Sequence, residues 1–147
     1  MPVRGSAFVV ILRGRRVLLV QSRDDRRWQL PGGRIEKHET AWGAAQREVM
    51  EESGLHVRLV SLTGVYPRRK SGPVYIFGGR VSRPDLLCGP TDEIRRQRWL
   101  TFTQAAPLLS KAVRRRLRDA LRRPSNFRSR PDFVRRLPPL LAKLGTA

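Results

Sequence analysis

The sequence contains one cysteine, two histidines and four lysines, and acidic residues are also few. The single cysteine, Cys88, cannot form a disulfide within the chain, which fits a reducing compartment. No stretch approaches the roughly 20 apolar residues of a membrane-spanning helix. The first apolar run, residues 7–12, is too short for the core of a signal peptide. We therefore expect a soluble, cytoplasmic protein with no membrane partner.

Positive charge is abundant, and almost all of it is arginine. The 147 residues include 31 Lys and Arg against 12 Asp and Glu, a formal net charge of +19. Such a field attracts polyanions such as nucleotides, RNA or DNA. A compositional preference for arginine, with many side chains simply solvated, explains the excess equally well. No base-reading motif such as a helix-turn-helix or a zinc finger is present.

The length suits one domain with a hydrophobic core. The charge density changes near residue 110, because residues 1–109 have a net charge of +9 and residues 110–147 have +10. We therefore expect a domain over residues 1–110, and a basic, mainly helical extension over 111–147 packed on the same domain. Within the extension, Val113, Leu117 and Leu121 follow helical spacing.

Strands and helices are expected to alternate along the chain without a strict βαβ repeat. This pattern favours the α/β class, with a mixed sheet and helices on its faces. Strands are expected at 7–12, 16–21, 28–30, 57–65, 74–81 and 98–100. Helices are expected at 41–53, from a cap at Thr103 to residue 109, and over 113–121. A linker is expected at 124–131, followed by an apolar stripe with helical spacing at 133–144 that prolines interrupt.

The helix expected between the cap Thr40 and Gly54 has an unusual arrangement of acidic residues. On a helical wheel, Glu48 and Glu52 border and partly overlap the apolar face, and Glu51 lies further round. Carboxylates gathered at a half-buried edge repel one another unless a cation compensates. Oxygen ligands with no neighbouring Cys or His ligand indicate a hard cation, Mg²⁺ or Mn²⁺.

The segment from Gly33 to Leu55 resembles the Nudix hydrolase signature at every specified position. The neighbouring segments 30–33 and 99–102 are also similar to the family. The resemblance implies a Nudix-like α/β/α sandwich with a mixed sheet. It also implies metal-dependent hydrolysis, by activated-water attack at phosphorus, of a nucleoside diphosphate linked to another group. One departure is His38, because the family often has glycine at that position; we do not expect this histidine to be catalytic.

The resemblance also assigns roles by position. Glu48, Glu51 and Glu52 would be metal ligands, with the carbonyl of Gly33 as a possible further ligand. Arg47 would orient the glutamates, and Glu39 would support them. The general base varies in the family between a signature glutamate and one from a later loop, where Glu93 is the candidate in this chain.

Substrate contacts are less well specified by the sequence. We expect Trp28 either to stack on a base or to lie in the core. Arg23 and Arg34 are expected either to hold the outer phosphates or to be solvated. Tyr75 is a candidate for the border of the substrate pocket. No downstream motif selects among ADP-ribose, dinucleoside polyphosphate, NADH or coenzyme A substrates. Two alternatives stay open: an RNA 5′-end pyrophosphohydrolase that uses the basic residues 111–136, and a non-catalytic nucleotide sensor, against which the intact signature argues. The sequence does not specify the oligomeric state.

Overall fold

The computed structural model describes residues 4–128. Its strands are β1 (Ser6–Arg13), β2 (Arg16–Ser22), β3 (Trp28–Gln29), β4 (Gly32–Arg34), β5 (Val57–Tyr66), β6 (Val74–Val81) and β7 (Ile94–Thr101). Its helices are α1 (Ala41–Ser53), α2 (Phe102–Ala105) and α3 (Lys111–Leu121), with 3-10 turns at Ala106–Leu108 and Pro124–Phe127. Within residues 4–128, no helix is both long and apolar enough to cross a membrane.

The strands form one mixed sheet with β1 near its centre. The main path runs β3-β2-β1-β6-β5, while β4 also pairs with β1 and β7 also pairs with β2. Strands β1 and β6 are parallel, and the other pairs are antiparallel. The expected mixed sheet is therefore confirmed.

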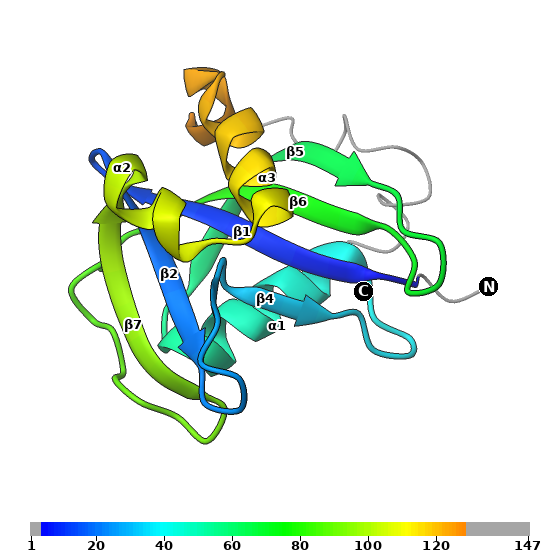
Figure 1. Ribbon diagram of the computed structural model, residues 1–147, viewed down its shortest axis with the longest axis horizontal. Coiled ribbons are helices and arrows are strands. Elements are labelled where there is room, and N and C mark those ends of the chain that lie inside the picture. The colour runs from blue at the N-terminus through cyan, green and yellow to red at the C-terminus, as the bar shows by residue number, and fades with distance from the viewer. Residues whose placement is uncertain (1–3, 129–147) are drawn as a thin grey trace.

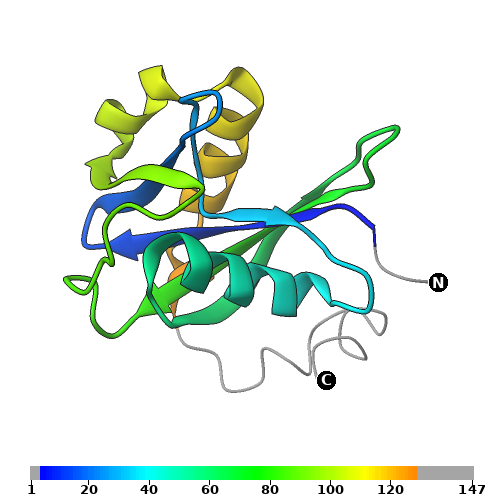
Figure 2. The ribbon, with the colours of Figure 1, turned by 90° about the horizontal axis from the view of Figure 1, so that it is seen from below.

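Helices cover both faces of this sheet (Figures 1 and 2). Helix α1 packs on one face, over Val9, Ile11 and Phe77. Helices α2 and α3 lie on the other face, over Val10 and Ile76. Alternate residues of β1 therefore point into different apolar layers, as the period of two along a strand requires. The expected sandwich is confirmed.

Helix α1 begins and ends where its cap residues predict. The hydroxyl of Thr40 accepts a hydrogen bond from the Gly43 amide at 2.7 Å. Gly54 adopts a left-handed conformation with φ of 76°, and its amide donates to the Met50 carbonyl. Such caps satisfy backbone groups that have no partner within the helix.

The region after residue 93 differs from the expectation. Strand β7 is longer than the three residues predicted, because Ile94–Thr101 pairs along β2. The following helix is capped by Thr101 and not by Thr103, through a capping box with Gln104. The first part of the strand was missed because arginines interrupt the apolar pattern that marks a strand.

The chain from α3 to Phe127 is part of the core. Leu117 is fully buried, and the hydroxyl of Tyr66 on β5 donates to Asp119 of α3 at 2.8 Å. The linker expected at 124–131 is wrong in its first half, since Pro124–Phe127 forms a 3-10 turn that buries Phe127. The helical stripe expected at 133–144 lies outside the described residues.

Candidate active site

The candidate site lies where the backbone of β4 meets the last turns of α1. The Gly32 amide donates a hydrogen bond to Oε2 of Glu52 at 3.1 Å. A Cβ atom at Gly33 would lie 2.7 Å from Oε1 of Glu48, so a side chain at this position would displace the carboxylate. The two glycines therefore let the strand approach the helix closely enough to contact its glutamates.

The three glutamates differ in burial as the helical wheel predicts. Glu52 is 5% exposed. The side chain of Glu48 is 12% exposed, and that of Glu51 is 53% exposed. Glu52 thus lies in the interior, and Glu48 is half-buried, next to the apolar layer between α1 and the sheet.

Glu48 and Glu52 form a coupled pair. The pKa of Glu52 is raised to about 9, chiefly by burial and in addition by the nearby charge of Glu48, against the lowering effect of the hydrogen bond from the Gly32 amide. The pKa of Glu48 is also raised, chiefly by burial, against the opposing effect of Arg47. Because each carboxyl group affects the protonation of the other, the two titrate together. A proton retained on Glu52 at neutral pH reduces the repulsion between two neighbouring carboxylates.

Arg47 connects the outer glutamates. Its Nε and Nη2 atoms donate to the two carboxylate oxygens of Glu39 at 2.6 and 2.9 Å. Its Nη1 atom donates to Glu48 at 2.9 Å and to Glu51 at 3.1 Å. A further bond reaches the Arg34 carbonyl at 3.2 Å, which ties the helix to β4. The arrangement agrees with orienting and supporting roles for Arg47 and Glu39.

The loop before α1 is closed by Glu39 and carries one unusual backbone conformation. Oε1 of Glu39 accepts from the Glu36 amide at 2.9 Å. His38 has a φ of 67°, in the left-handed region that glycine adopts without strain. This conformation gives a physical reason for glycine at this position in related sequences. The histidine is exposed.

The residues of the site fit a divalent cation in part. Within residues 4–128, no group of three or more His, Cys, Asp or Glu side chains already converges as a metal site. The carboxyl groups of Glu48 and Glu52 nevertheless already lie together against β4. Glu51 is directed to Arg47 instead. Carboxylate oxygens and a nearby backbone carbonyl are the ligand types that suit Mg²⁺ and Mn²⁺.

Glu93, the expected later-loop carboxylate, lies close enough to influence Glu52. Its charge contributes to the raised pKa of Glu52. The loop that carries it is held by Arg23, whose amide donates to the Glu93 carbonyl at 2.9 Å. The Arg23 side chain donates through Nε to the Thr91 carbonyl at 2.7 Å. Arg23 therefore supports the Glu93 loop in this structure.

The other predicted substrate residues are separated in the fold. Arg34 lines a basic cavity beside β4. Trp28 packs against the apolar layer under α3 and lines a different cavity. Tyr75 is 9% exposed and belongs to the layer under α1.

Gln97 contacts the site and was not predicted. Its Nε2 atom donates to the Glu52 carbonyl at 2.6 Å and to the Gly89 carbonyl at 2.8 Å. It therefore links β7 to the end of α1 and to the preceding loop. A lone glutamine between arginines carries no sequence signal for this role, because the contact depends on the pairing of β7 with β2.

Comparisons with known proteins identify the family of this chain. Residues 2–122 match the NUDIX domain family model. Over 88 residues, the chain is 36% identical to the "Putative 8-oxo-dGTP diphosphatase" of Bacillus subtilis (strain 168), covering 58% of this chain and 59% of that protein. Over 122 residues, it is 32% identical to the "MutT-like protein" of Streptomyces ambofaciens, covering 78% of this chain and 74% of that protein.

Solved structures show the same fold. A NUDIX hydrolase from Nitrosomonas europaea matches with a TM-score of 0.73 at 19% identity, covering 88% of this chain and 76% of that chain. An Ap4A hydrolase from C. elegans matches with a TM-score of 0.69 at 21% identity, covering 80% of this chain and 96% of that chain. Because the family model spans most of the sequence and the fold agrees with it, this chain belongs to the NUDIX domain family.

Proposed function

We propose that the chain is a metal-dependent pyrophosphohydrolase that acts on a nucleoside diphosphate linked to another group. The observation that carries the proposal is the pair of Glu48 and Glu52, whose carboxyl groups both lie against the glycines of β4 at the edge of the apolar layer. Burying two carboxylates against each other lowers stability, so the arrangement has a physical reason if a cation and a phosphate bind there. The relatives named as a diphosphatase and an Ap4A hydrolase support this substrate class.

Glu48, Glu51 and Glu52 would hold Mg²⁺ or Mn²⁺, together with the Gly33 carbonyl. A bound divalent ion would supply charge neutralisation at the phosphate oxygens and acidify water. Arg47 holds Glu48 and Glu51 in place through Nη1. Glu93 is our candidate for the base that accepts the proton of the attacking water, because it comes from a later loop and its charge acts on Glu52.

Two cavities flank the glycine turn and suit different parts of a nucleotide. The first has a volume of about 410 Å³ and is lined by Arg34 with three further cationic side chains, Arg4, Lys37 and Lys70. Such cations suit the outer phosphates of a substrate. We place the phosphate chain on this side because Arg34 directly follows the two glycines of β4.

The second cavity is smaller and largely apolar. Its volume is about 170 Å³, and its lining combines Phe8, Leu30, Ile76 and Val113 with Gln29, Arg68 and Arg116. Phe8 pairs directly with Gly32 across the sheet, so this cavity adjoins the site from the face opposite α1. An apolar wall with an amide and cations suits a nucleobase.

A hydrolysis screen with Mg²⁺ and with Mn²⁺ tests the proposal. The substrates should include nucleoside triphosphates, nucleotide sugars, dinucleoside polyphosphates and 5′-triphosphorylated RNA. We expect turnover of at least one class, and loss of nearly all turnover in Glu52→Gln with an unchanged fold by circular dichroism. Near-normal turnover in that variant would contradict the assignment. Binding without turnover would favour a nucleotide sensor, and selective turnover of the RNA would favour a 5′-end pyrophosphohydrolase.

A further inference from the structure

The hairpin between β1 and β2 brings two arginines into directly opposite positions. Arg13 and Arg16 are cross-strand partners on either side of a turn that contains Gly14. Like charges directly opposite each other in a sheet lower its stability. No carboxylate of residues 4–128 forms an ion pair with either guanidinium group at up to 4.0 Å. The described part of the fold thus leaves this repulsion uncompensated.

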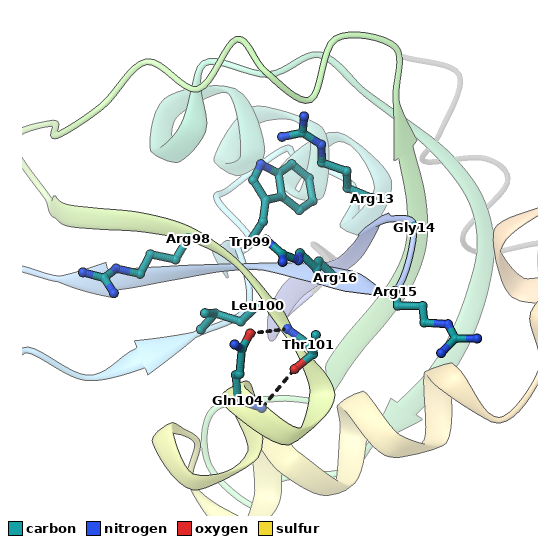
Figure 3. A pocket seen from close by; sticks show the side chains of 9 residues that line it. All are labelled: Arg13, Gly14, Arg15, Arg16, Arg98, Trp99, Leu100, Thr101 and Gln104. Carbon is teal, nitrogen blue, oxygen red and sulfur yellow. Dashed lines mark hydrogen bonds between the residues drawn. The ribbon is translucent and has the colours of Figure 1, made fainter.

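These arginines line a cavity of about 840 Å³ at the open edge of the sheet (Figure 3). The complete lining is Arg13, Gly14, Arg15, Arg16, Arg98, Trp99, Leu100, Thr101 and Gln104. It contains four arginines and no acidic residue. A cavity of one charge sign concentrates ions of the opposite sign.

Strand register determines which of these side chains share a face. Arg16 pairs with Thr101, and Leu18 pairs with Trp99. Because side chains alternate along a strand, Arg13, Arg16 and Trp99 lie on the same face of the sheet. In Figure 3, the side chains of Arg13 and Arg16 lie on the same side as the Trp99 indole, while those of Arg15 and Arg98 point away to either side.

The capping box of α2 adds neutral donors to this cavity. The Gln104 side-chain oxygen accepts from the Thr101 amide at 3.0 Å, and the Thr101 hydroxyl oxygen accepts from the Gln104 amide at 3.3 Å. Both oxygens are therefore engaged with the backbone. The side-chain NH₂ of Gln104 and the hydroxyl proton of Thr101 remain available as donors to a ligand.

The cavity is separate from the carboxylate cluster and from the two cavities beside β4, with which it shares no residue. Strand β7 is one connection between this cavity and the cluster. Gln97, which binds the Glu52 carbonyl, lies two residues before Trp99 on the same face of that strand. The function proposed above does not use this second site.

We propose that the Arg13–Arg16 cavity is a second anion site that binds phosphate groups. Guanidinium groups donate paired hydrogen bonds that match phosphate oxygens, and a bound phosphate would neutralise the cross-strand repulsion. The phosphates come either from a small polyphosphate or from the backbone of single-stranded RNA. Both present the same oxygen chemistry to the site.

Isothermal titration of the full chain in EDTA and about 0.15 M salt tests the site. The two probes are inorganic tripolyphosphate and a ten-nucleotide RNA with a 5′-hydroxyl. We expect Arg13→Gln/Arg16→Gln to weaken binding of at least one probe about tenfold or more. The probe that loses affinity identifies the source of the phosphates.

The matched control removes the same two charges elsewhere. Arg83 and Arg122 are exposed and lie 3.8 and 3.9 Å from Asp85 and Asp119. Arg83→Gln/Arg122→Gln should change affinity much less than the hairpin pair. Equal weakening by both variants would mean that only the net charge attracts the probe, and would overturn the proposal. Failure of the wild type to bind either probe, or unchanged affinity in the hairpin variant, would also overturn it.

Thermal unfolding gives a second readout. Without anion, we expect Arg13→Gln/Arg16→Gln to unfold at the same temperature as wild type or a higher one, since repulsion across the hairpin is removed. Tripolyphosphate or RNA should raise the unfolding temperature of wild type more than that of the variant. A lower unfolding temperature in the anion-free variant would show that the arginines stabilise the hairpin by themselves, which contradicts the proposal.

Discussion

Arg47 and Glu39 form a two-point ion pair, with Nε to Oε2 at 2.6 Å and Nη2 to Oε1 at 2.9 Å. The hydrogen bonds with Arg47 hold the pKa of Glu39 below its usual range, and the same contacts raise the pKa of Arg47. The pair fixes the plane of the guanidinium group. Its remaining nitrogen, Nη1, then points at Glu48 and Glu51.

Replacing Arg47 by lysine should therefore impair function although the charge is kept. A lysine ammonium cannot contact both oxygens of Glu39 and also reach Glu48 in one fixed plane. We expect kcat/KM to fall about 10- to 100-fold, the range typical of residues that orient metal ligands. The exposed Arg83→Lys is the matched control, and an equal effect of both substitutions would contradict the orienting role.

Glu52→Gln should stabilise the metal-free protein at alkaline pH. The pKa of Glu52 is raised to about 9 in the folded chain, from an ordinary value of 4.5. Between these values the folded chain keeps a proton that the unfolded chain has released, so the free energy of unfolding falls as the pH rises. Glutamine has no such proton to lose, and its side-chain oxygen can still accept a hydrogen bond from the Gly32 amide.

Urea unfolding in EDTA at pH 4 and at pH 8 measures this effect. At pH 8 the variant should be more stable than wild type by about 1 kcal/mol or more. At pH 4 the difference should shrink, because the carboxyl group is then largely protonated in both states. A difference that does not change with pH would contradict the burial of an ionisable pair at this site.

Glu93→Gln tests the candidate base. If Glu93 accepts the proton of the attacking water, kcat should fall about 10²- to 10⁴-fold and the acidic limb of its pH profile should be lost. Asp92→Asn removes the same charge one residue earlier. It should leave kcat and the acidic limb of the pH profile nearly unchanged. Equal effects of the two substitutions would show that the negative charge of the loop matters, and not a specific base.

Much of the site was predictable because it is local in sequence. The cap residues Thr40 and Gly54 and the three glutamates belong to one helix. In a helix, the spacing of residues along the chain determines which side chains face the core. The low exposure of Glu52 follows from the same wheel. Sequence could not predict the raised pKa of Glu52, since its burial depends on how closely β4 approaches α1.

The features that were missed depend on contacts between distant segments. Gln97 reaches Glu52 only because β7 pairs with β2 along its whole length. The half-buried positions Arg95 and Gln97 of that strand are polar like the exposed Arg96 and Arg98, which hides its period-two pattern, so only its end was predicted. Phe127 lies beyond a proline that suggests a linker, yet the 3-10 turn returns it to the core.

Leu117→Ala tests whether α3 stabilises the NUDIX fold. Leu117 is fully buried in the layer between α3 and the sheet. Truncation of such a leucine should lower the free energy of unfolding by about 2–5 kcal/mol. Lys111→Ala, at an exposed position of the same helix, should change it by less than about 0.5 kcal/mol. Equal, small changes in urea unfolding would show that the domain is stable without α3.

His38→Gly should stabilise the protein. A residue other than glycine loses about 1 kcal/mol or more in the left-handed conformation, and His38 has a φ of 67°. Glycine removes this strain, although it also makes the unfolded chain more flexible, so we expect the free energy of unfolding in urea to rise by about 0.5–1 kcal/mol.

The other histidine, His56, is exposed and is absent from the positive-φ residues of the described chain. At His56 the same substitution should instead lower the free energy of unfolding by about 0.5–1 kcal/mol, because glycine makes the unfolded chain more flexible and relieves no strain there. Equal losses at both positions would show that the loop before Glu39 carries no backbone strain at residue 38. A gain at His38 alone would show that the left-handed turn carries backbone strain in the loop that the Glu39 carboxylate closes on the Glu36 amide.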